Sequence, residues 1–245
     1  MKRAARNMKR MDNGETIFSV HSEVPRPDLK LVRKISTLPT ANLSDAAGNL
    51  HTMDSGIQAM WPGARLCGPA CTVATRSGDF LATLLGLGAA QRGDVLVIDN
   101  QGSPDTALWG EITTAEAKRK GLAGLVVDGN VRDIEGIRKR KFPVFARGTV
   151  PRVTGRNSLG EVNVPIQCGG AVVRPGDLVV GDADGVVVIP REKAEETLRL
   201  ALDILAYEKR FLRKVLQGGT QIEMLSLHQR FESLSRTHLK GHGKC

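Results

Sequence analysis

Aromatic residues are scarce in this chain of 245 residues: only 4% are Phe, Trp or Tyr, and there is a single tyrosine. Proteins that bind single-stranded nucleic acids stack bases on aromatic side chains, so few residues are available for that mode of binding. The chain also lacks a run of about 20 apolar residues, the length that a transmembrane helix needs. The first thirty residues are basic and polar and contain no apolar segment typical of a secretory signal. We therefore expect a cytoplasmic protein.

The cysteines form no metal-binding pattern, and the glycine-rich motifs of nucleotide-binding proteins are absent. The four cysteines, Cys67, Cys71, Cys168 and Cys245, form no CxxC pair and lie near no histidine at zinc-finger spacing. We expect reduced thiols, with Cys67 and Cys71 buried in an apolar segment. Neither GxGxxG nor GxxxxGK[ST] occurs, so the sequence does not support nucleotide chemistry.

Positive charge is abundant, with a formal net charge of +9, but it lies at the two ends of the chain. Residues 1–10 carry five positive charges and no negative one, and residues 230–245 carry a net charge of three. The remainder has a net charge of only +1. This distribution favours solvated basic tails over a nucleic-acid-binding surface on the folded body.

Apolar runs and turn residues predict an α/β fold with strands alternating with helices in the first half and clustered in the second. We expect helices at 29–35, 80–90, 111–120 and 191–217. We expect one more helix after Ser44, which would cap it, and another that begins near Asp133. We expect strands at 70–75, 94–98, 124–128, 142–147, 162–167, 171–174, 177–180 and 185–189. We interpret 1–28 as a basic leader, 29–219 as one catalytic domain that includes a long C-terminal helix, and 220–245 as a basic tail.

The segment from Trp109 to Asp133 has the strongest chemical pattern. Glu111 lies at the start of a predicted helix, and Arg132 and Asp133 follow the next predicted strand, which gives the spacing Glu-x20-Arg-Asp. A helix followed by a strand returns the chain to its starting level, so these residues are expected to face one cleft at the carboxyl ends of the strands.

The residue types in this pattern suit an anionic ligand and a hard metal ion. Arg132 has a planar guanidinium for a carboxylate. The backbone N–H groups near Gly110, Ile112 and Thr113 lie at a helix N-terminus, where anions bind. Asp133 and Glu111 supply oxygen donors of the kind that Mg²⁺ or Mn²⁺ prefers. A plainer interpretation, acidic residues in helix first turns and a surface ion pair, remains open for each residue alone.

These residues, together with RGDVLVID (92–99), GLVVDGNVRD (124–133) and GDADGVVVIP (181–190), resemble the 4-hydroxy-4-methyl-2-oxoglutarate aldolase family, which is related to the regulator of ribonuclease activity A. The resemblance covers roughly 44–218. The family pattern is usually Asp-x20-Arg-Asp, so Glu111 is a departure that keeps the charge on a longer side chain.

The resemblance implies a three-layer swivelling β/β/α domain and a class II pyruvate aldolase with oxaloacetate decarboxylase activity. It implies Mg²⁺ or Mn²⁺ as the cofactor, and a homotrimer or hexamer whose site lies between subunits. Asp133 would hold the metal, with Glu208 of the long helix as a second candidate ligand to a neighbour's metal. Arg132 would bind the 2-oxo carboxylate, and Glu111 would take the proton of the substrate hydroxyl.

Two other functions stay open. The first is a non-catalytic regulator that binds another protein, as the regulator of ribonuclease activity A does; it would work without metal and tolerate changes at Arg132. The second is binding of RNA or DNA through the basic tails, which would show strong salt dependence. The full set of carboxylates favours the lyase.

Overall fold

A computed structural model describes residues 19–21, 23–156, 160–227, 229 and 231. By its internal contacts the chain divides into two compact units, the first ending at Ala201 and the second starting at Leu202. The predicted elements fall mainly in the first unit, which carries the candidate site.

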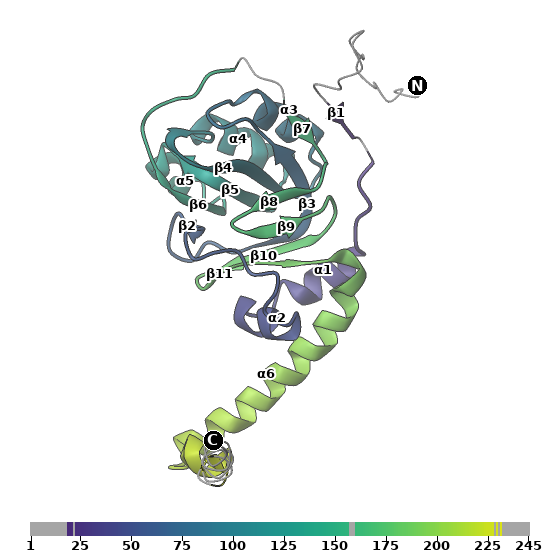
Figure 1. Cartoon of the computed structure of the whole chain (residues 1–245), viewed down its shortest axis with the longest axis vertical. Coiled ribbons are helices and arrows are strands. Elements are labelled where there is room, and N and C mark those ends of the chain that lie inside the picture. The colour runs from purple at the N-terminus through teal and green to yellow at the C-terminus, as the bar shows by residue number, and fades with distance from the viewer. Residues whose placement is uncertain (1–18, 22, 157–159, 228, 230, 232–245) are drawn as a thin grey trace, which may run out of the picture. The chain divides into compact units, whose positions relative to one another are not determined.

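Four parallel neighbouring strands form the centre of the first unit (Figure 1). They are β3 (Leu66–Ala74), β4 (Val95–Ala107), β5 (Gly124–Val131) and β6 (Val144–Thr149). Val95 is paired with Gly124, so β4 and β5 start level with one another, and Val95 is also paired with Ala70 in the middle of β3. The apolar runs that predicted these strands are buried on both faces, as expected for parallel strands covered on each side.

Three helices cover one face of this sheet. They are α3 (Leu81–Ala89), α4 (Glu111–Lys120) and α5 (Ile134–Lys139). Leu87, Ala117 and Ile137 pack from these helices against the strands in one apolar core. The bounds of α4 are those predicted, because Gly121 ends the helix in a left-handed conformation with φ of 78°.

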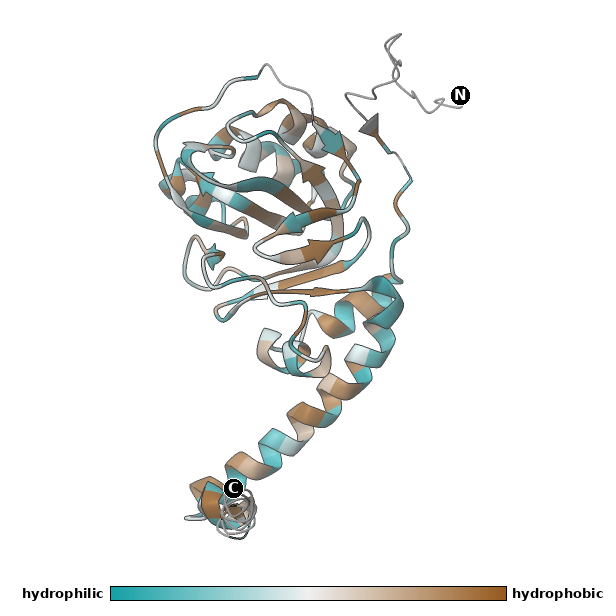
Figure 2. Cartoon of the chain, in the orientation of Figure 1, coloured by the Kyte–Doolittle hydropathy of each residue, from teal (hydrophilic) through white to brown (hydrophobic). Residues whose placement is uncertain are grey.

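Four short strands cover the opposite face and complete a β/β/α arrangement. They are β8 (Ile166–Cys168), β9 (Ala171–Val173), β10 (Leu178–Asp182) and β11 (Gly185–Ile189). A second apolar core lies between these strands and the central sheet. Figure 2 shows the brown of apolar residues along the strands of this unit. The predicted α/β fold class is therefore confirmed.

The helix predicted to begin after Ser44 is wrong in its position. The chain forms α1 (Leu29–Ile35), as predicted, and then α2 (Thr40–Ala46), which ends where the second helix was expected to start. The cap of α2 comes from β10: the carboxylate of Asp182 accepts bonds from the N–H of Thr40 at 3.0 Å and from its Oγ1 at 2.5 Å. Because this cap lies 142 positions away, the local pattern could not reveal it.

The sheet edges also differ from the sequence prediction. β1 (Ser19–Val20) and β2 (Gln58–Ala59) were not predicted. The single strand expected at 162–167 is two strands, β7 (Glu161–Val162) and β8, and Asn163 between them has a positive φ of 59°. A residue in this left-handed region breaks an extended strand.

The predicted C-terminal helix is present as a short 3-10 turn, η1 (Arg191–Lys193), followed by α6 (Ala194–Leu216). α6 runs from the first unit into the second, where α7 (Gln221–Met224) follows. Most of the leader and much of the tail predicted from the sequence lie outside the described residues. Within the described part of the chain, no helix is both long enough and apolar enough to span a membrane.

Candidate active site

A cavity of about 270 Å³ lies on the helical side of the sheet, beyond the carboxyl ends of β4, β5 and β6. Ligand sites in α/β folds favour this position. The side chains and backbone around it belong to Phe80, Leu84, Ala107, Trp109, Gly110, Ile112, Thr113, Glu116, Arg132, Asp133, Val153 and Arg156. Five of the six predicted site residues near the Glu-x20-Arg-Asp pattern therefore line one cavity; Glu111 is the exception.

The N-terminus of α4 opens onto this cavity. Gly110 is the cap residue, and the hydroxyl of Thr113 accepts the Gly110 N–H at 3.1 Å. Among the described residues, the backbone N–H groups of Ile112 and Thr113 have no acceptor. These two donors and the positive end of the helix dipole are suited to a carboxylate.

Arg132 and Asp133 are held beside that helix end by backbone geometry. The N–H of Arg132 donates to the carbonyl of Trp109 at 2.9 Å. Asp133 adopts the left-handed conformation with φ of 57°, which is uncommon for residues other than glycine, asparagine and aspartate. Its Oδ2 accepts the N–H of Glu111 at 3.1 Å and lies 3.7 Å from Nε of Arg132. Both side chains remain partly exposed to solvent.

The side chain of Glu111 turns away from the cavity toward α5. Its carboxylate forms an ion pair with Arg140 and packs against Gly136, where an added Cβ would clash with the Glu111 carboxyl carbon. Arg140 also donates to the Gly136 carbonyl at 3.2 Å. The backbone of Glu111 therefore belongs to the predicted site, whereas its carboxylate is engaged elsewhere.

Two charged residues that the sequence analysis did not select, Glu116 and Arg156, also line the cavity. Glu116 is four positions after Ile112 on α4, a helical spacing that puts both on one face and that could have identified it. Arg156 lies in the loop after β6, with its guanidinium carbon 5.7 Å from the centre of the Phe80 ring. No sequence pattern marks Arg156.

Asp133 fits a hydrated divalent cation better than a cage of protein ligands. In the described part of the chain, no group of three or more His, Cys, Asp or Glu side chains is placed to hold a metal ion. Mg²⁺ commonly binds through one or two carboxylates and keeps several waters, and a partly exposed Asp133 suits that mode. Glu208 lies on α6 in the second unit and is exposed, and its predicted role as a metal ligand stays a prediction.

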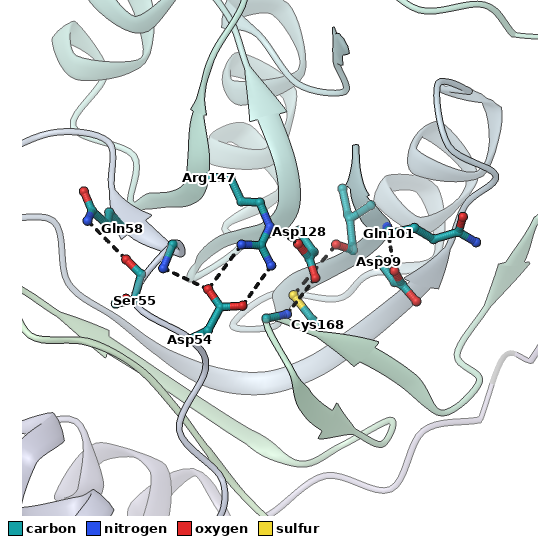
Figure 3. A network of polar contacts seen from close by, with 11 residues as sticks. Asp54, Ser55, Gln58, Asp99, Gln101, Asp128, Arg147 and Cys168 are labelled. Atoms are coloured by element: carbon teal, nitrogen blue, oxygen red, sulfur yellow. Dashed lines mark hydrogen bonds and ion pairs between the residues drawn. The ribbon is translucent and has the colours of Figure 1, made fainter. Parts of the chain in front are cut away.

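A second polar cluster lies on the opposite face of the sheet (Figure 3). Arg147 pairs with Asp54 at 2.9 Å and with the buried Asp128, whose Oδ2 accepts the Gly169 N–H at 2.7 Å. The hydrogen bond from Arg147 lowers the pKa of Asp54. Asp99 accepts the Gln101 N–H at 2.8 Å, and its burial raises its pKa. These bonds join β5 and β6 to the loops around them, so we interpret the cluster as structural.

The thiols of Cys67, Cys71 and Cys168 take no part in the chemistry of the cavity or of the second polar cluster. Cys71 and Cys168 are buried and Cys67 is partly buried, and all three are free thiols. Burial raises the pKa of Cys67 and of Cys71 to about 12, which keeps both protonated and unreactive.

Known proteins share this chain's sequence and fold. The RraA-like family model, described as Aldolase/RraA, matches residues 40–188. A protein of Halalkalibacterium halodurans named "Putative 4-hydroxy-4-methyl-2-oxoglutarate aldolase" is 42% identical over 174 residues, which cover 71% of this chain and 83% of that protein.

Solved structures agree with this relationship. An uncharacterized protein from Pseudomonas syringae superposes with a TM-score of 0.71 at 31% identity, over 80% of this chain and 96% of that one. Streptomyces coelicolor RraAS2, described as an unusual member of the RNase ES inhibitor RraA protein family, superposes with a TM-score of 0.70 at 35% identity, over 77% and 98%. With the family model matching well over half of its length, the chain belongs to the RraA-like (Aldolase/RraA) family.

Proposed function

We propose that this protein is a divalent-metal-dependent lyase that cleaves a 4-hydroxy-2-oxo acid to pyruvate and also decarboxylates oxaloacetate. The observation that carries the proposal is the convergence of Arg132, Asp133 and the open N-terminus of α4 on one cavity. The name of the Halalkalibacterium halodurans relative supports the same chemistry.

The 2-oxo acid end of the substrate would bind between Arg132 and α4. The guanidinium and the free N–H groups of Ile112 and Thr113 are donors that line the same cavity, and a carboxylate has the acceptor oxygens to use both. Apolar residues such as Trp109 and Leu84 line the same cavity and limit the access of water to these contacts.

The far end of the substrate would meet Arg156. This second guanidinium lines the same cavity as Arg132, so the site offers cations for two separate carboxylates. A dicarboxylic 2-oxo acid such as 4-hydroxy-4-methyl-2-oxoglutarate matches that arrangement better than a monocarboxylic one.

Asp133 would hold the Mg²⁺ or Mn²⁺, with water as the remaining ligands in the described part of the chain. When bound, such a cation acts as a Lewis acid toward the 2-oxo group. Arg132 would stabilise the negative charge that develops on the enolate oxygen as the carbon–carbon bond breaks. Assembly as a homotrimer or hexamer, with Glu208 reaching a neighbour's site, is part of the same proposal.

The test is pyruvate release from 4-hydroxy-4-methyl-2-oxoglutarate and from oxaloacetate, with Mg²⁺ or with EDTA, followed through coupled lactate dehydrogenase. We expect metal-dependent release from both compounds. Arg132→Ala should lower kcat/KM about 10²-fold or more, because it removes charge stabilisation in the transition state. Arg33→Ala, an exposed arginine on α1, is the matched control and should leave the rate unchanged.

A non-catalytic regulator is the second candidate, and the similarity to Streptomyces coelicolor RraAS2 favours it. A regulator would bind its partner protein equally well with EDTA and after Arg132→Ala. If the folded protein releases no pyruvate from either compound with metal present, the lyase proposal is wrong and this second function takes its place.

A further inference from the structure

The carboxylate at the first position of the Glu-x20-Arg-Asp pattern does not face the substrate cavity. Glu111 is paired with Arg140 and packed against Gly136 on α5, and it does not line the cavity. To act on a substrate hydroxyl it would have to break this ion pair and rotate around α4. The aldol reaction proposed above needs a proton acceptor, so another group has to supply it.

The helix α4 presents its residues in three directions. Thr114 and Ala117 are buried in the core, and Glu111 and Lys118 contact Arg140, the residue that follows α5. The remaining direction holds residues that line the cavity, among them Glu116. The helical repeat therefore puts a second carboxylate on the cavity side, about one turn beyond the free N–H groups.

Glu116 is available for chemistry in a way that Glu111 is not. Its side chain is exposed, and within the described residues it has no hydrogen-bond or ion-pair partner. The cavity brings it together with the guanidinium groups of Arg132 and Arg156. A substrate held at its two ends by these cations would place its middle, which carries the C4 hydroxyl, near the Glu116 side of the cavity.

We propose that Glu116 is the general base of the aldol cleavage, an inference that rests on the function proposed above. Glu116 takes the proton of the C4 hydroxyl, the C4–O bond becomes a carbonyl, and the C3–C4 bond breaks. The electron pair of that bond passes to the enolate of pyruvate. The proton then returns from Glu116 to C3 of the enolate, directly or through water, so that pyruvate leaves and the carboxylate is regenerated. Glu111 is a positioning residue that fixes α5 through Arg140.

Comparing two reactions of the same protein distinguishes a general base from a residue with only a structural role. Aldol cleavage of 4-hydroxy-4-methyl-2-oxoglutarate needs the base, whereas decarboxylation of oxaloacetate loses CO₂ and has no hydroxyl proton to remove. Glu116→Gln should lower kcat for the aldol cleavage about 10²-fold or more and leave the decarboxylation within about threefold of the wild type. Glu116→Asp should recover part of the aldol rate. Glu135→Gln, which replaces an exposed acid on α5 outside the cavity, is the matched control.

Different results would contradict the role of Glu116 and the proposed lyase function. Near-normal aldol cleavage by Glu116→Gln, or an equal loss in both reactions, would overturn it while leaving the lyase function standing. A selective loss of aldol cleavage in Glu111→Gln, with Glu116→Gln unaffected, would assign the base to Glu111 instead. A folded wild-type protein that is inactive on both compounds would remove the proposed function and the role of Glu116 together.

Discussion

The backbone N–H of Glu111 donates to Oδ2 of Asp133 at 3.1 Å, although the two residues are 22 positions apart. This bond joins the first turn of α4 to the residue that follows β5. The two ends of the Glu-x20-Arg-Asp pattern meet because the chain runs out along α4 and returns along β5 to the level of the helix start. The Asp133 carboxylate is thereby fixed at the helix end that faces the cavity.

The close approach of Asp133 depends on Gly110, which gives the first prediction. A Cβ at Gly110 would lie 2.5 Å from Oδ2 of Asp133 and 3.4 Å from Cγ of Arg132. Since φ of Gly110 is −155°, alanine fits the backbone there, and the conflict is with the Asp133 side chain alone. Gly110→Ala should keep the fold and lower kcat/KM for pyruvate release about 10²-fold, because it displaces the proposed metal ligand.

Gly88→Ala on α3 is the control for this substitution, since a Cβ there meets nothing within 4 Å. Its rate should equal that of the wild type. The apparent affinity for Mg²⁺, measured from the dependence of rate on metal concentration, should fall in Gly110→Ala and stay constant in Gly88→Ala. Wild-type activity and metal affinity in Gly110→Ala would contradict the role given to Asp133.

Local patterns predicted the central elements because their signals are local. The buried apolar runs marked β4 and β5, and Gly121 marked the end of α4. The second helix was misplaced because its cap, Asp182, comes from a strand far along the chain. The edge strands β1 and β2 have two residues each, too few for a periodic pattern.

In the candidate site, too, local patterns predicted some residues and missed those that depend on distant parts of the chain. Spacing along the chain brought Arg132 and Asp133 to the end of α4, and the structure agrees. The direction of the Glu111 side chain was beyond prediction, because it is decided by Gly136 on α5 and by Arg140 at the end of that helix. Arg156 lies in the irregular loop after β6, and no spacing rule links it to Arg132. Only Glu116 had a usable signal, its helical distance from Ile112.

Arg156 gives a second prediction, on substrate selection. If its guanidinium binds the distal carboxylate, Arg156→Gln should lower kcat/KM for 4-hydroxy-4-methyl-2-oxoglutarate about 10- to 100-fold, the usual cost of losing one charged hydrogen bond. The loss should appear mainly as a higher KM, since this contact exists before and during bond cleavage. Arg119→Gln, on the exposed surface of α4, is the control. A fall in kcat with constant KM would argue against a binding role.

A third prediction concerns stability. Asp94 is almost fully buried, with its side chain 1% exposed, and Arg26 holds it with two hydrogen bonds at 2.8 and 2.9 Å. Arg26→Ala leaves a buried carboxylate without its cation, so we expect a loss of about 3 kcal/mol in the free energy of unfolding, measured by urea denaturation. The double variant Arg26→Ala with Asp94→Asn should recover part of the loss. Equal stability of Arg26→Ala and the wild type would show that this ion pair contributes little.

The last prediction uses pH to test the cluster on the other face of the sheet. Burial raises the pKa of Asp99 above its ordinary value of 3.8, and the nearby charge of Asp128 adds to the effect. Because the pKa is higher in the folded than in the unfolded protein, ionising Asp99 costs folding free energy at any pH above the raised value. That cost decreases as the pH falls through the raised pKa and is absent below 3.8.

Asp99→Asn removes this charge while its side-chain oxygen can still accept the Gln101 N–H. We therefore expect Asp99→Asn to raise Tm at pH 7 by roughly 1–2 °C, a small rise because Asp99 is only partly buried. The difference from the wild type should vanish near pH 3. Asp105→Asn, at an exposed position, controls for the general effect of losing one negative charge. A Tm difference that is the same at both pH values would mean that the Asp99 charge is not its cause. A lower Tm at pH 7 would mean that the charge stabilises the fold.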